Sequence, residues 1–584
     1  MSNQKYLTAL RTVKHLRASQ VFRRLVNIVD RDVFRGGLHR SPEVPQNVSV
    51  SNHFSIVPNL DDGNHPPPNL IQNLNRGIFR HLNEEKNLGR TLPDWMLGQQ
   101  TSSRLWTITL HYHRWAYDLA ELAARGGPDA DTAATLFKHY VMDWITRCEV
   151  TEPGARDLAW NSYAISTRIP WWIRSYQTIP REWWSCNSEF LDRLLKSLWM
   201  QAAFLHKHLE YDLRANHLLR NAVGLGWAGR FFSDRFSEQW LRTATRLALD
   251  QIEEQVLPDG GHFERSAMYH LLIMEDLCNL ARVMEDKQAR DQICSTWERM
   301  ARCLVWLRHP DGRIPILNDA SLNGASAPDQ MLAQAELMDL EIEMSSPVGG
   351  KLFPDFGVFA WHGDPWTVFF DVGQIGVDYQ PGHGHADTLT AELSFKGHRL
   401  FVDPGTYGYD LDDRRRYDRA TASHNTVCVD GFDSSEVWHI FRCGRRAYPE
   451  HIQLTKSSDG FSVSASHTGY CHLPGSPRPT REITLRKSEL VIMDRCEGSG
   501  SHRLTGGWLL APGWTAKRFD EGWEVSMPAC GCMIVRIEGS PHLKLTQSRK
   551  WYHPEFGLEL LATRLEWSLD KVLPAEIMTI ISPQ

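Results

Sequence analysis

The stretch LDRLLKSLWMQAAFLHKHL, residues 191–209, decides the fold of the first half of the chain. Its apolar side chains recur every three or four residues, at Leu191, Leu194, Leu195, Leu198, Ala202, Leu205 and Leu209. That spacing lays one apolar stripe along a helix of about 3.6 residues per turn. Similar patterns recur at 105–124, 133–147, 238–257, 266–285 and 329–343, with loops that carry proline and glycine between them. We therefore predict an (α/α) toroid or a helical solenoid over residues 91–345.

From about residue 350 the apolar side chains recur every second residue instead. Leu389, Ala391, Leu393 and Phe395 alternate with polar side chains, and similar short runs continue at 483–485, 490–493 and 533–537. This alternation is typical of half-buried antiparallel strands. We predict an antiparallel β-sandwich over residues 350–584, connected to the toroid through residues 344–352. The fold class is then α+β multidomain, and residues 1–90 form an N-terminal extension with an irregular segment at 42–68.

The composition excludes some classes of protein. The chain has 584 residues with 64 Lys and Arg against 70 Asp and Glu, a formal net charge of −6. This balance argues against a nucleic-acid-binding protein, because such domains are usually strongly basic. No apolar run approaches the length of about 18 residues that a membrane span needs, and the basic N-terminus lacks the apolar core of a signal peptide. The 11 cysteines are scattered without CxxC pairs, as is usual for reduced thiols. We expect a cytoplasmic protein, with a periplasmic or secreted location left open.

The densest cluster of potential metal ligands is PGHGHAD, residues 381–387. In an extended strand, His383, His385 and Asp387 point to one face. Asp403 ends an apolar run in FVDPG at 401–405, and His424 lies in TASHNTV at 421–427. Imidazole and carboxylate groups are a usual ligand set for Zn²⁺. These residues are therefore candidates for a metal site, and the alternative from the residues alone is a polar strand end without a metal.

Two motifs in the helical part carry further candidates. In YDLRANHLLRN, residues 211–221, Asn216 and Arg220 share a helix face if the helix continues through them. A helix cap is the alternative role for Asn216. In DGGHFERSAMYH, residues 259–270, a glycine-rich turn leads into a helix that places Arg265 and Tyr269 one turn apart. A packed core position is the alternative for Tyr269.

These motifs, taken in order, resemble a known family. GHGHAD at 382–387, LFVDPGTYGY at 400–409 and RYDRATASHNTVCVDG at 416–431 resemble the C-terminal domain of the heparinase II/III superfamily of polysaccharide lyases. NHLLRNAVGL at 216–225 and PDGGHFERSAMYHLLIMEDL at 258–277 are similar to the family's helical catalytic motifs. Trp106 before LHY at 110–112, and STRI at 166–169, look like further family landmarks. The resemblance extends over roughly residues 90–580 and implies an active site between a toroid and a sandwich.

The resemblance also implies roles for individual residues. Asn216 and His217 match the pair that binds and neutralises the substrate carboxylate, Tyr269 matches the catalytic tyrosine, and His383 matches the catalytic histidine. The resemblance implies a second tyrosine from the sandwich, for which Tyr417 is our choice and Tyr409 the rival. It implies a Zn²⁺ ion, structural or organising the cleft, with three ligands: His385, Asp403 and His424.

An anionic polysaccharide requires local positive charge and flat apolar faces. The residues that we predict to bind substrate are Arg168, Arg220, Arg265, His270, Arg419 and Trp106. The run Arg414-Arg415-Arg416 could add charge, with a solvated loop as the alternative. Five tryptophans could serve as sugar platforms, with packing in the core as the alternative for each: Trp95, Trp106, Trp160, Trp171 and Trp172.

The implied reaction is β-elimination at a uronic acid, which leaves a 4,5-unsaturated end. Either Tyr269 or His383 could remove the C5 proton, and the sequence leaves that choice open. One alternative is a glycoside hydrolase on the same toroid, but the carboxylates of Asp259, Glu264 and Glu275 form no compelling pair. A second alternative is a non-catalytic accessory protein of polysaccharide synthesis that binds glycans.

Overall fold

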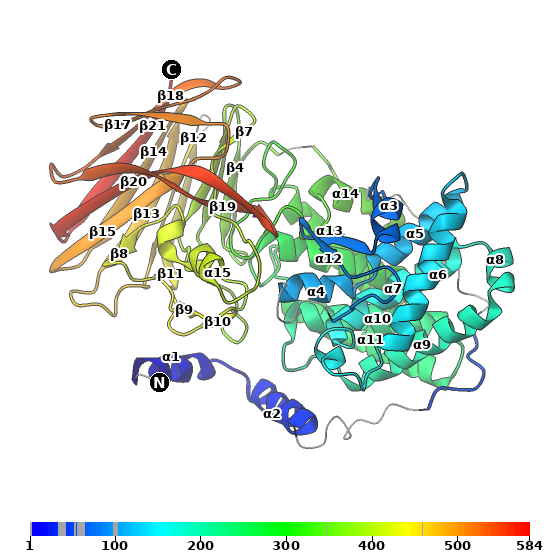
Figure 1. Ribbon diagram of the computed structural model, residues 1–584. Coiled ribbons are helices and arrows are strands. Elements are labelled where there is room, and N and C mark those ends of the chain that lie inside the picture. The colour runs from blue at the N-terminus through cyan, green and yellow to red at the C-terminus, as the bar shows by residue number, and fades with distance from the viewer. Residues whose placement is uncertain are drawn as a thin grey trace.

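A helical half and a β half lie side by side in the computed structural model (Figure 1). The structure describes residues 3–32, 43–51, 54, 65–96, 103–345, 347–457 and 460–584. One cluster of buried apolar side chains runs through both halves, so they share a core. Within the described ranges, we find no helix with the length and apolar character that crossing a membrane requires.

The helical half begins with a short helix and a hairpin and continues as packed helices. The hairpin strands are β1 (Ile78–His81) and β2 (Glu84–Asn87). The helices are α3 (Leu70–Asn75), α4 (Arg104–Leu110), α5 (Arg114–Arg125), α6 (Ala130–Arg147), α7 (Ser162–Thr178), α8 (Arg181–Cys186), α9 (Ser188–Lys207), α10 (Ala215–Phe231), α11 (Arg235–Gln255), α12 (Ala267–Ala281), α13 (Lys287–Leu304) and α14 (Pro328–Ala333).

Helix α10 is the central helix of this half, and almost all of its side chains are buried. Two glycines let neighbouring helices approach its backbone. A Cβ at Gly224 would lie 2.7 Å from Cα of Ser166 on α7, and one at Gly229 would lie 2.7 Å from the backbone nitrogen of Leu241 on α11. Because α10 also carries Asn216 and His217 in its first turn, this packing fixes both residues at the junction of the halves.

The spacing of apolar residues correctly predicted most of the long helices, whereas two predicted helices differ from the structure. The pattern at 191–209 corresponds to α9, and those at 133–147, 238–257 and 266–285 correspond to α6, α11 and α12. The predicted helix at 105–124 is two helices, because His113 between them adopts a left-handed conformation with φ 61°. Its ring is buried, and Trp172 donates to its Nδ1 at 3.0 Å, which holds the bend. The predicted helix at 329–343 ends as a 3₁₀ turn at Met338, before the left-handed Asp339.

The β half consists of antiparallel sheets. A five-stranded sheet has the order β3 (Gly349–Phe353), β4 (Val358–His362), β5 (Trp366–Asp371), β6 (Ala391–Phe395), β7 (His398–Phe401). An eight-stranded sheet has the order β11 (Pro449–Ser457), β12 (Gly460–His467), β13 (Arg478–Arg486), β14 (Glu489–Glu497), β21 (Ala575–Pro583), β18 (Gly531–Glu538), β17 (Gly522–Met527), β16 (Thr515–Phe519). A four-stranded sheet has the order β19 (Lys544–Glu555), β20 (Leu558–Val572), β15 (Ser501–Leu509), β8 (Cys428–Val429). Along the chain, helix α15 (Asp413–Arg419) and the short strands β9 (Val437–Trp438) and β10 (Arg442–Cys443) come between β7 and β11.

The alternating sequence patterns account for these strands. Along β13 and β14, buried and partly exposed side chains alternate, and Ile483 pairs with Ile492 across the ladder. A helical N-terminal part followed by antiparallel sheets is therefore confirmed. The connection predicted at 344–352 is shorter than expected, because β3 already begins at Gly349.

Two helices precede the helical half and lie along both halves (Figure 1). They are α1 (Asn3–Val13) and α2 (Ala18–Asp32). Arg11 of α1 forms an ion pair with Glu436 of the β half at 3.0 Å, while Arg17, just before α2, forms one with Glu254 of the helical half at 2.8 Å. Of the irregular segment predicted at 42–68, residues 42, 52–53 and 55–64 lie outside the described residues. Its described part packs on the helical half, since Val50 forms a β-bridge with Phe232.

Candidate active site between the helical and β halves

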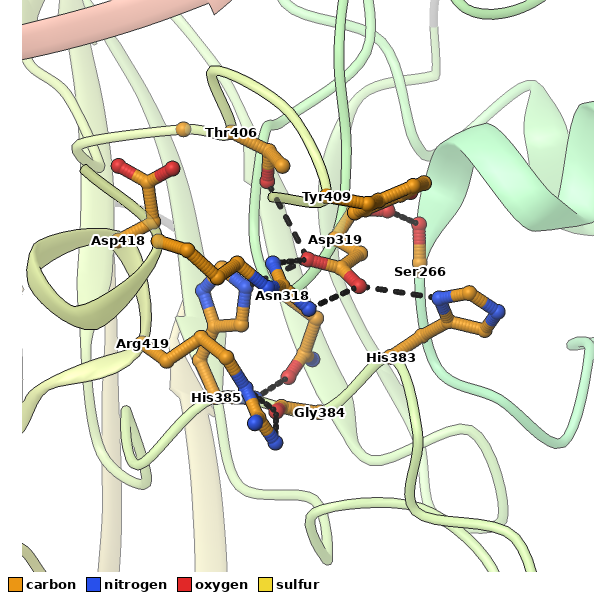
Figure 2. A network of polar contacts seen from close by, with 12 residues as sticks. Ser266, Asn318, Asp319, His383, Gly384, His385, Thr406, Tyr409, Asp418 and Arg419 are labelled. Carbon is orange, nitrogen blue, oxygen red and sulfur yellow. Dashed lines mark hydrogen bonds and ion pairs between the residues drawn. The ribbon is translucent and has the colours of Figure 1, made fainter. Parts of the chain in front are cut away.

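Asp319 is the centre of a buried polar network at the junction of the two halves (Figure 2). It lies in the connection between α13 and α14. Its Oδ2 is 3.0 Å from Nδ1 of His383 and its Oδ1 is 2.8 Å from Nε2 of His385. The backbones are joined as well, because the Asp319 amide donates to the His383 carbonyl and the His385 amide donates to Oδ1 of Asn318. The connection from the helical half therefore fixes both histidines of the PGHGHAD motif.

The Arg415 guanidinium holds Asp319 in its charged form. Arg415 donates to both carboxylate oxygens, at 2.9 Å to Oδ2, and the two side chains are almost fully buried. Burial alone would raise the pKa of Asp319, but Arg415 and the two histidine hydrogen bonds hold it well below its usual range. A buried carboxylate that stays charged can orient an imidazole and stabilise its protonated form.

His383 is placed to exchange a proton with a ligand. Asp319 occupies its Nδ1, so Nε2 faces the other way, 3.6 Å from Oε2 of Glu264. The ring stacks on the ring of Tyr269, with 3.8 Å between centroids and 28° between planes. An Asp–His pair stacked against a tyrosine provides a potential base and a potential acid within one contact distance.

Tyr269 lies in the first turn of α12, whose N-cap residue Ser266 accepts a hydrogen bond from the Tyr269 amide at 3.4 Å. The Ser266 hydroxyl in turn donates to the Asp319 carbonyl at 2.6 Å, which joins the helix start to the polar network. The Tyr269 hydroxyl lies 3.0 Å from the hydroxyl of Tyr409 in the β half. Burial, reinforced by Tyr409 and Asp319, raises the pKa of Tyr269 well above its usual value. Tyr269 is therefore a protonated phenol at neutral pH, which favours the role of acid.

The first turn of α10 faces the same region with Asn216 and His217. Glu210 lies 3.0 Å from Nδ1 of His217 and is itself held by the side-chain amide of Asn221 at 2.9 Å. Burial lowers the pKa of His217, but Glu210 outweighs this effect, so the net shift is upward from 6.5. The upward shift favours the charged form of His217, which suits a carboxylate ligand at a helix N-terminus because the charge and the helix dipole both attract an anion.

Glu264 lies between these two groups of residues. Its carboxyl is buried and 3.6 Å from Nε2 of His383. Burial raises the pKa of Glu264, while His383, His217 and the Asn216 amide oppose that rise. The pair from α10 and the pair of His383 and Tyr269 thus share one carboxyl neighbour, and they form one site.

A second cluster lies directly behind the first. The ligand atoms of His385, Asp387 and His424 all lie within 4.8 Å of one another, and all three residues are buried. Asp319 occupies Nε2 of His385, and Oδ2 of Asp403 lies 2.8 Å from Nδ1 of His424. Within the described part of the chain, His385 Nδ1, His424 Nε2 and Asp387 Oδ2 have no hydrogen-bond partner. Histidines that carry a carboxylate on one nitrogen and leave the other free are typical metal ligands, so these residues fit a divalent cation.

The surroundings of the cluster also favour a cation. Burial, together with Asp403, raises the pKa of Asp387 to about 6, although His424 opposes the rise. Burial and the nearby Asp387 raise the pKa of Asp371 well above its usual value. Carboxyls crowded together in the interior are unfavourable unless a proton or a metal ion neutralises them.

Two consecutive parts of the chain, which together make up most of its length, match one known protein family. Residues 79–338 match the family described as Heparinase II/III N-terminus, and residues 346–577 match Heparinase II/III-like, C-terminal. The chain belongs to the heparinase II/III family of polysaccharide lyases. Together the two matches contain every residue of the site just described.

Named relatives agree with this assignment. A heparin-sulfate lyase of Bacteroides stercoris is 24% identical over 519 residues, which span 79% of this chain and 74% of the relative. A heparin-sulfate lyase of Pedobacter heparinus is 26% identical over 264 residues, 41% of this chain and 40% of the relative. A crystal structure of heparinase III has the same fold, with a TM-score of 0.73 at 17% identity, and the match spans 92% of this chain and 88% of that one.

The structure separates the two tyrosines that the heparinase II/III resemblance left as rivals. The hydroxyl of Tyr409, the rival, lies 3.0 Å from the hydroxyl of Tyr269. Tyr417, our first choice, lies on α15 and donates to the carbonyl of Trp551 at 2.9 Å. Its hydroxyl is therefore engaged in the β half, and the tyrosine of the β half beside the catalytic candidates is Tyr409.

Most residues predicted to bind substrate prove to be buried framework. Arg168 is fully buried and donates to Gln201, His111 and Ala159. Four others also direct polar groups to backbone carbonyls, and Arg265 among them is only partly buried. The contacts are His270 to Met300, Trp106 to Glu84, Arg265 to Phe356 and Arg419 to Gly384, His439, Ile440 and Arg442. Arg419 still matters for the site, because it holds the glycine between the two histidines of the motif.

Arg220 and Trp171 differ from this group, since both line a cavity in the helical half. The other four candidate platform tryptophans, Trp95, Trp106, Trp160 and Trp172, are buried. The arginine run at 414–416 is not a solvated loop. It lies in α15, and its middle residue, Arg415, is the buried partner of Asp319.

Asp403, predicted as a metal ligand, contacts Nδ1 of His424, and the carboxylate that lies in the cluster with His385 and His424 is that of Asp387.

Asp319, Arg415 and Glu264 had no predicted role as ligand or catalytic residue. The available signal for Asp319 was a polar pair, Asn318-Asp319, directly after the apolar run IPIL at 314–317. A charged residue in such a place is rarely buried without a partner, but the sequence does not name that partner.

Proposed function

We propose that the protein is a lyase that cleaves a uronate-containing, glycosaminoglycan-like polysaccharide by β-elimination and leaves a 4,5-unsaturated uronate end. Three groups at the junction of the halves carry the proposal: the Asp319–His383 pair, the protonated Tyr269 stacked on His383, and Asn216 with His217, which share the neighbour Glu264 with His383. The heparin-sulfate lyases among the relatives support this substrate class. We propose that the two halves form the (α/α) toroid and β-sandwich of this family.

In this proposal His383 removes the C5 proton. Asp319 accepts the hydrogen of Nδ1, which leaves a lone pair on Nε2 for the proton. The imidazolium that forms is stabilised by the charged Asp319 carboxylate, which stays unprotonated because Arg415 holds it. A positioned base of this kind contributes about 10²–10⁴-fold to a rate.

Tyr269 is the matching acid. Its raised pKa keeps the phenol protonated until the C4–O4 bond breaks, when the leaving oxygen takes the proton. The electron pair of the C5–H bond becomes the C4–C5 double bond, and the leaving sugar departs as an alcohol. Tyr409, 3.0 Å away through its hydroxyl, holds the Tyr269 hydroxyl in position. Later proton transfer from His383 to Tyr269 restores both groups.

Asn216 and His217 neutralise the substrate carboxylate. Loss of the C5 proton spreads negative charge into that carboxylate, so a donor there is worth more in the transition state than in the ground state. One preorganised donor contributes about 3–4 kcal/mol in comparable oxyanion sites. Glu210 raises the pKa of His217 and so favours its charged form, and the first turn of α10 carries both side chains.

The test is a panel of uronate polysaccharides, with the ultraviolet absorbance of the new C4–C5 double bond as the measurement. We expect absorbance to rise with at least one glycosaminoglycan-like substrate and chain length to fall in parallel. New reducing ends without absorbance would indicate hydrolysis and contradict the proposal. Binding of uronate oligosaccharides without cleavage across the panel would favour the accessory, glycan-binding alternative.

We also propose that His385, Asp387 and His424 hold a divalent cation, with Zn²⁺ as the first candidate. The support is the set of three buried ligand atoms without protein partners, backed by Asp319 and Asp403. A bound Zn²⁺ would neutralise the Asp387 carboxylate and fix both imidazoles. Because Asp319 contacts His385 and His383 alike, a rigid His385 also keeps the Asp319–His383 pair in place.

Metal analysis of the purified protein is expected to find stoichiometric zinc, and removal by a chelator is expected to lower the melting temperature. A ligand at a hundredfold excess over its Kd stabilises a folded protein by about 2.7 kcal/mol. His424→Ala should abolish zinc retention, whereas His467→Ala, at a buried histidine outside the cluster, should not. Zinc retained by His424→Ala, or a melting temperature unchanged by chelation, would contradict the metal proposal.

A further inference from the structure

A cavity of about 520 Å³ in the helical half is lined by arginines from four helices and a loop. Its volume is in the range of sites for small organic ligands, roughly 300–1,000 Å³. The residues that carry the argument are Arg114 on α5, Trp171 and Arg174 on α7, Arg220 on α10, Arg282 at the end of α12, and Arg313. Neither the catalytic residues nor the metal cluster lines it.

Guanidinium groups outnumber carboxylates in the lining of this cavity. Five arginines line it, and Glu275 is the one acidic residue among the described residues that do so. Two of the arginines form ion pairs with carboxylates, Arg114 with Asp118 at 2.8 Å and Arg220 with Asp276 at 2.7 Å. The whole chain, by contrast, carries a formal net charge of −6. Arg282 and Arg313 donate to neutral oxygens, those of Gln334 and Leu322. A lining with more guanidinium groups than carboxylates suits an anionic ligand, because arginine binds carboxylate and sulfate oxygens through parallel hydrogen bonds.

The arginines are held in place before a ligand arrives. The guanidinium carbons of Arg114 and Arg174 lie 4.5 and 4.9 Å from the ring centroid of Trp171. Arg174 donates to the side-chain oxygen of Asn279 at 2.8 Å, and Arg282 donates to that of Gln334 at 3.1 Å. Guanidinium groups fixed by rings and amides lose little conformational entropy on binding an oxyanion.

The cavity adjoins the active site. Arg220 follows Asn216 by one turn of α10, and its guanidinium carbon is 5.7 Å from the ring centroid of Tyr163, which lies 4.9 Å from that of His217. On the other side, a Cβ on the lining residue Gly324 would lie 2.2 Å from Sδ of Met268, the residue before Tyr269. A saccharide in the cavity is therefore next to a uronate held by Asn216 and His217.

We propose that the arginine cavity is a subsite for an anionic group, sulfate or carboxylate, on a saccharide adjacent to the one that is cleaved. The inference rests on the proposed function only for its choice of uronate glycans as ligands. Arginine is suited to both anions, because its planar fork donates two parallel hydrogen bonds to either. The subsite would select glycans by the anionic groups that they carry beyond the cleaved uronate.

The test compares binding of two tetrasaccharides, one sulfated and derived from heparin and one unsulfated and derived from heparosan. Calorimetry in the Tyr269→Phe background avoids cleavage. We expect Arg282→Gln and Arg313→Gln each to weaken binding roughly tenfold, since one charge-assisted contact is lost. Weakening confined to the sulfated ligand would identify a sulfate subsite, and equal weakening of both would identify a carboxylate subsite.

Matched variants separate lost charge from lost structure. Arg302→Gln removes an exposed arginine that pairs with Glu298 on α13, and it should leave both affinities unchanged. Arg282→Lys keeps the charge and should retain most of the affinity. Wild-type affinity for both ligands in Arg282→Gln and Arg313→Gln, with unchanged melting temperatures, would overturn the proposal.

The subsite and the lyase activity can fail separately. If the wild-type protein cleaves a substrate, Arg282→Gln should raise KM while kcat changes little, because a remote contact of this kind acts on the bound ground state as well. If Arg282→Gln remains active with an unchanged KM, the subsite proposal fails and the lyase proposal stands. If the wild-type protein cleaves no substrate but Arg282→Gln still weakens tetrasaccharide binding, the subsite proposal stands and the lyase proposal fails.

Discussion

Replacing Tyr269 by phenylalanine is expected to lower kcat by about 10²–10⁴-fold while leaving the affinity for uronate oligosaccharides nearly unchanged. The substitution removes only the hydroxyl, and the ring can still stack on His383 at a centroid distance of 3.8 Å. Because the raised pKa keeps the phenol protonated, the lost group is the proton donor to the leaving oxygen. Initial rates of double-bond absorbance give kcat, and calorimetry with the same oligosaccharide gives the affinity.

Tyr417→Phe is the matched control for this experiment. It also removes one phenol hydroxyl, but that hydroxyl donates to the Trp551 carbonyl within the β half. We expect a modest loss of stability and little change in kcat. A Tyr269→Phe enzyme that keeps most of its kcat would show that another group protonates the leaving oxygen, and Tyr409 would be the next residue to substitute.

The fold was predictable where it depends on local periodicity. The apolar stripe at 191–209 needs only its own residues to specify a helix, and α9 spans Ser188–Lys207. The break between α4 and α5 was not predictable in this way. It depends on His113, whose left-handed backbone is stabilised by a hydrogen bond from Trp172, some sixty residues away. Sequence periodicity contains no information about such a long-range contact.

The site was predictable in its motifs and not in its contacts. Tyr269 and His383 lie in motifs far apart along the chain, and only the packed halves show that their rings stack. Tyr409 and Tyr417 lie eight positions apart near the same motif, and no pattern in the sequence favours Tyr409. Its side chain extends toward α12, whereas Tyr417 lies on a helix that turns its hydroxyl toward β19.

Residues that act through others were the hardest to find. Asp319 has no motif of its own, and its role appears only when Arg415, His383 and His385 surround it. Asp387 and Asp403 are both plausible metal ligands by residue type. In the folded chain Asp403 contacts Nδ1 of His424, while Asp387 lies in the cluster with His385 and His424. Only the fold distinguishes the two carboxylates in this way.

Asp319→Asn is expected to have the second large effect, on activity and stability together. Asparagine has nearly the same shape, but its neutral side chain cannot stabilise the His383 imidazolium and can present an amide where His383 needs an acceptor. Loss of the carboxylate that orients a catalytic histidine lowers kcat by about 10⁴-fold in comparable sites. The variant also leaves Arg415 buried without its counter-charge, at a cost of about 3–5 kcal/mol.

Asp418→Asn is the control that separates these two effects. Asp418 is also buried, lies 2.6 Å from Nδ1 of His553 and accepts from the Tyr407 amide at 2.9 Å. The control should lower stability through the same kind of lost contact, while the folded fraction keeps its kcat. Denaturant unfolding followed beside initial rates distinguishes a destabilised enzyme from an inactive one. Equal kcat in folded Asp319→Asn and Asp418→Asn would exclude Asp319 from catalysis.

The pH dependence of the stability loss provides an independent check on Asp319. Its folded pKa lies well below that of the unfolded chain, so the wild-type carboxylate contributes its full stability at pH values above about 3.9. Below that value the unfolded chain binds a proton that the folded protein still excludes, and the contribution is lost as the pH falls through the folded pKa. The stability difference between wild type and Asp319→Asn should therefore be constant near neutral pH and shrink in acid. A difference that instead grows in acid would show that Asp319 is not the charged partner of Arg415.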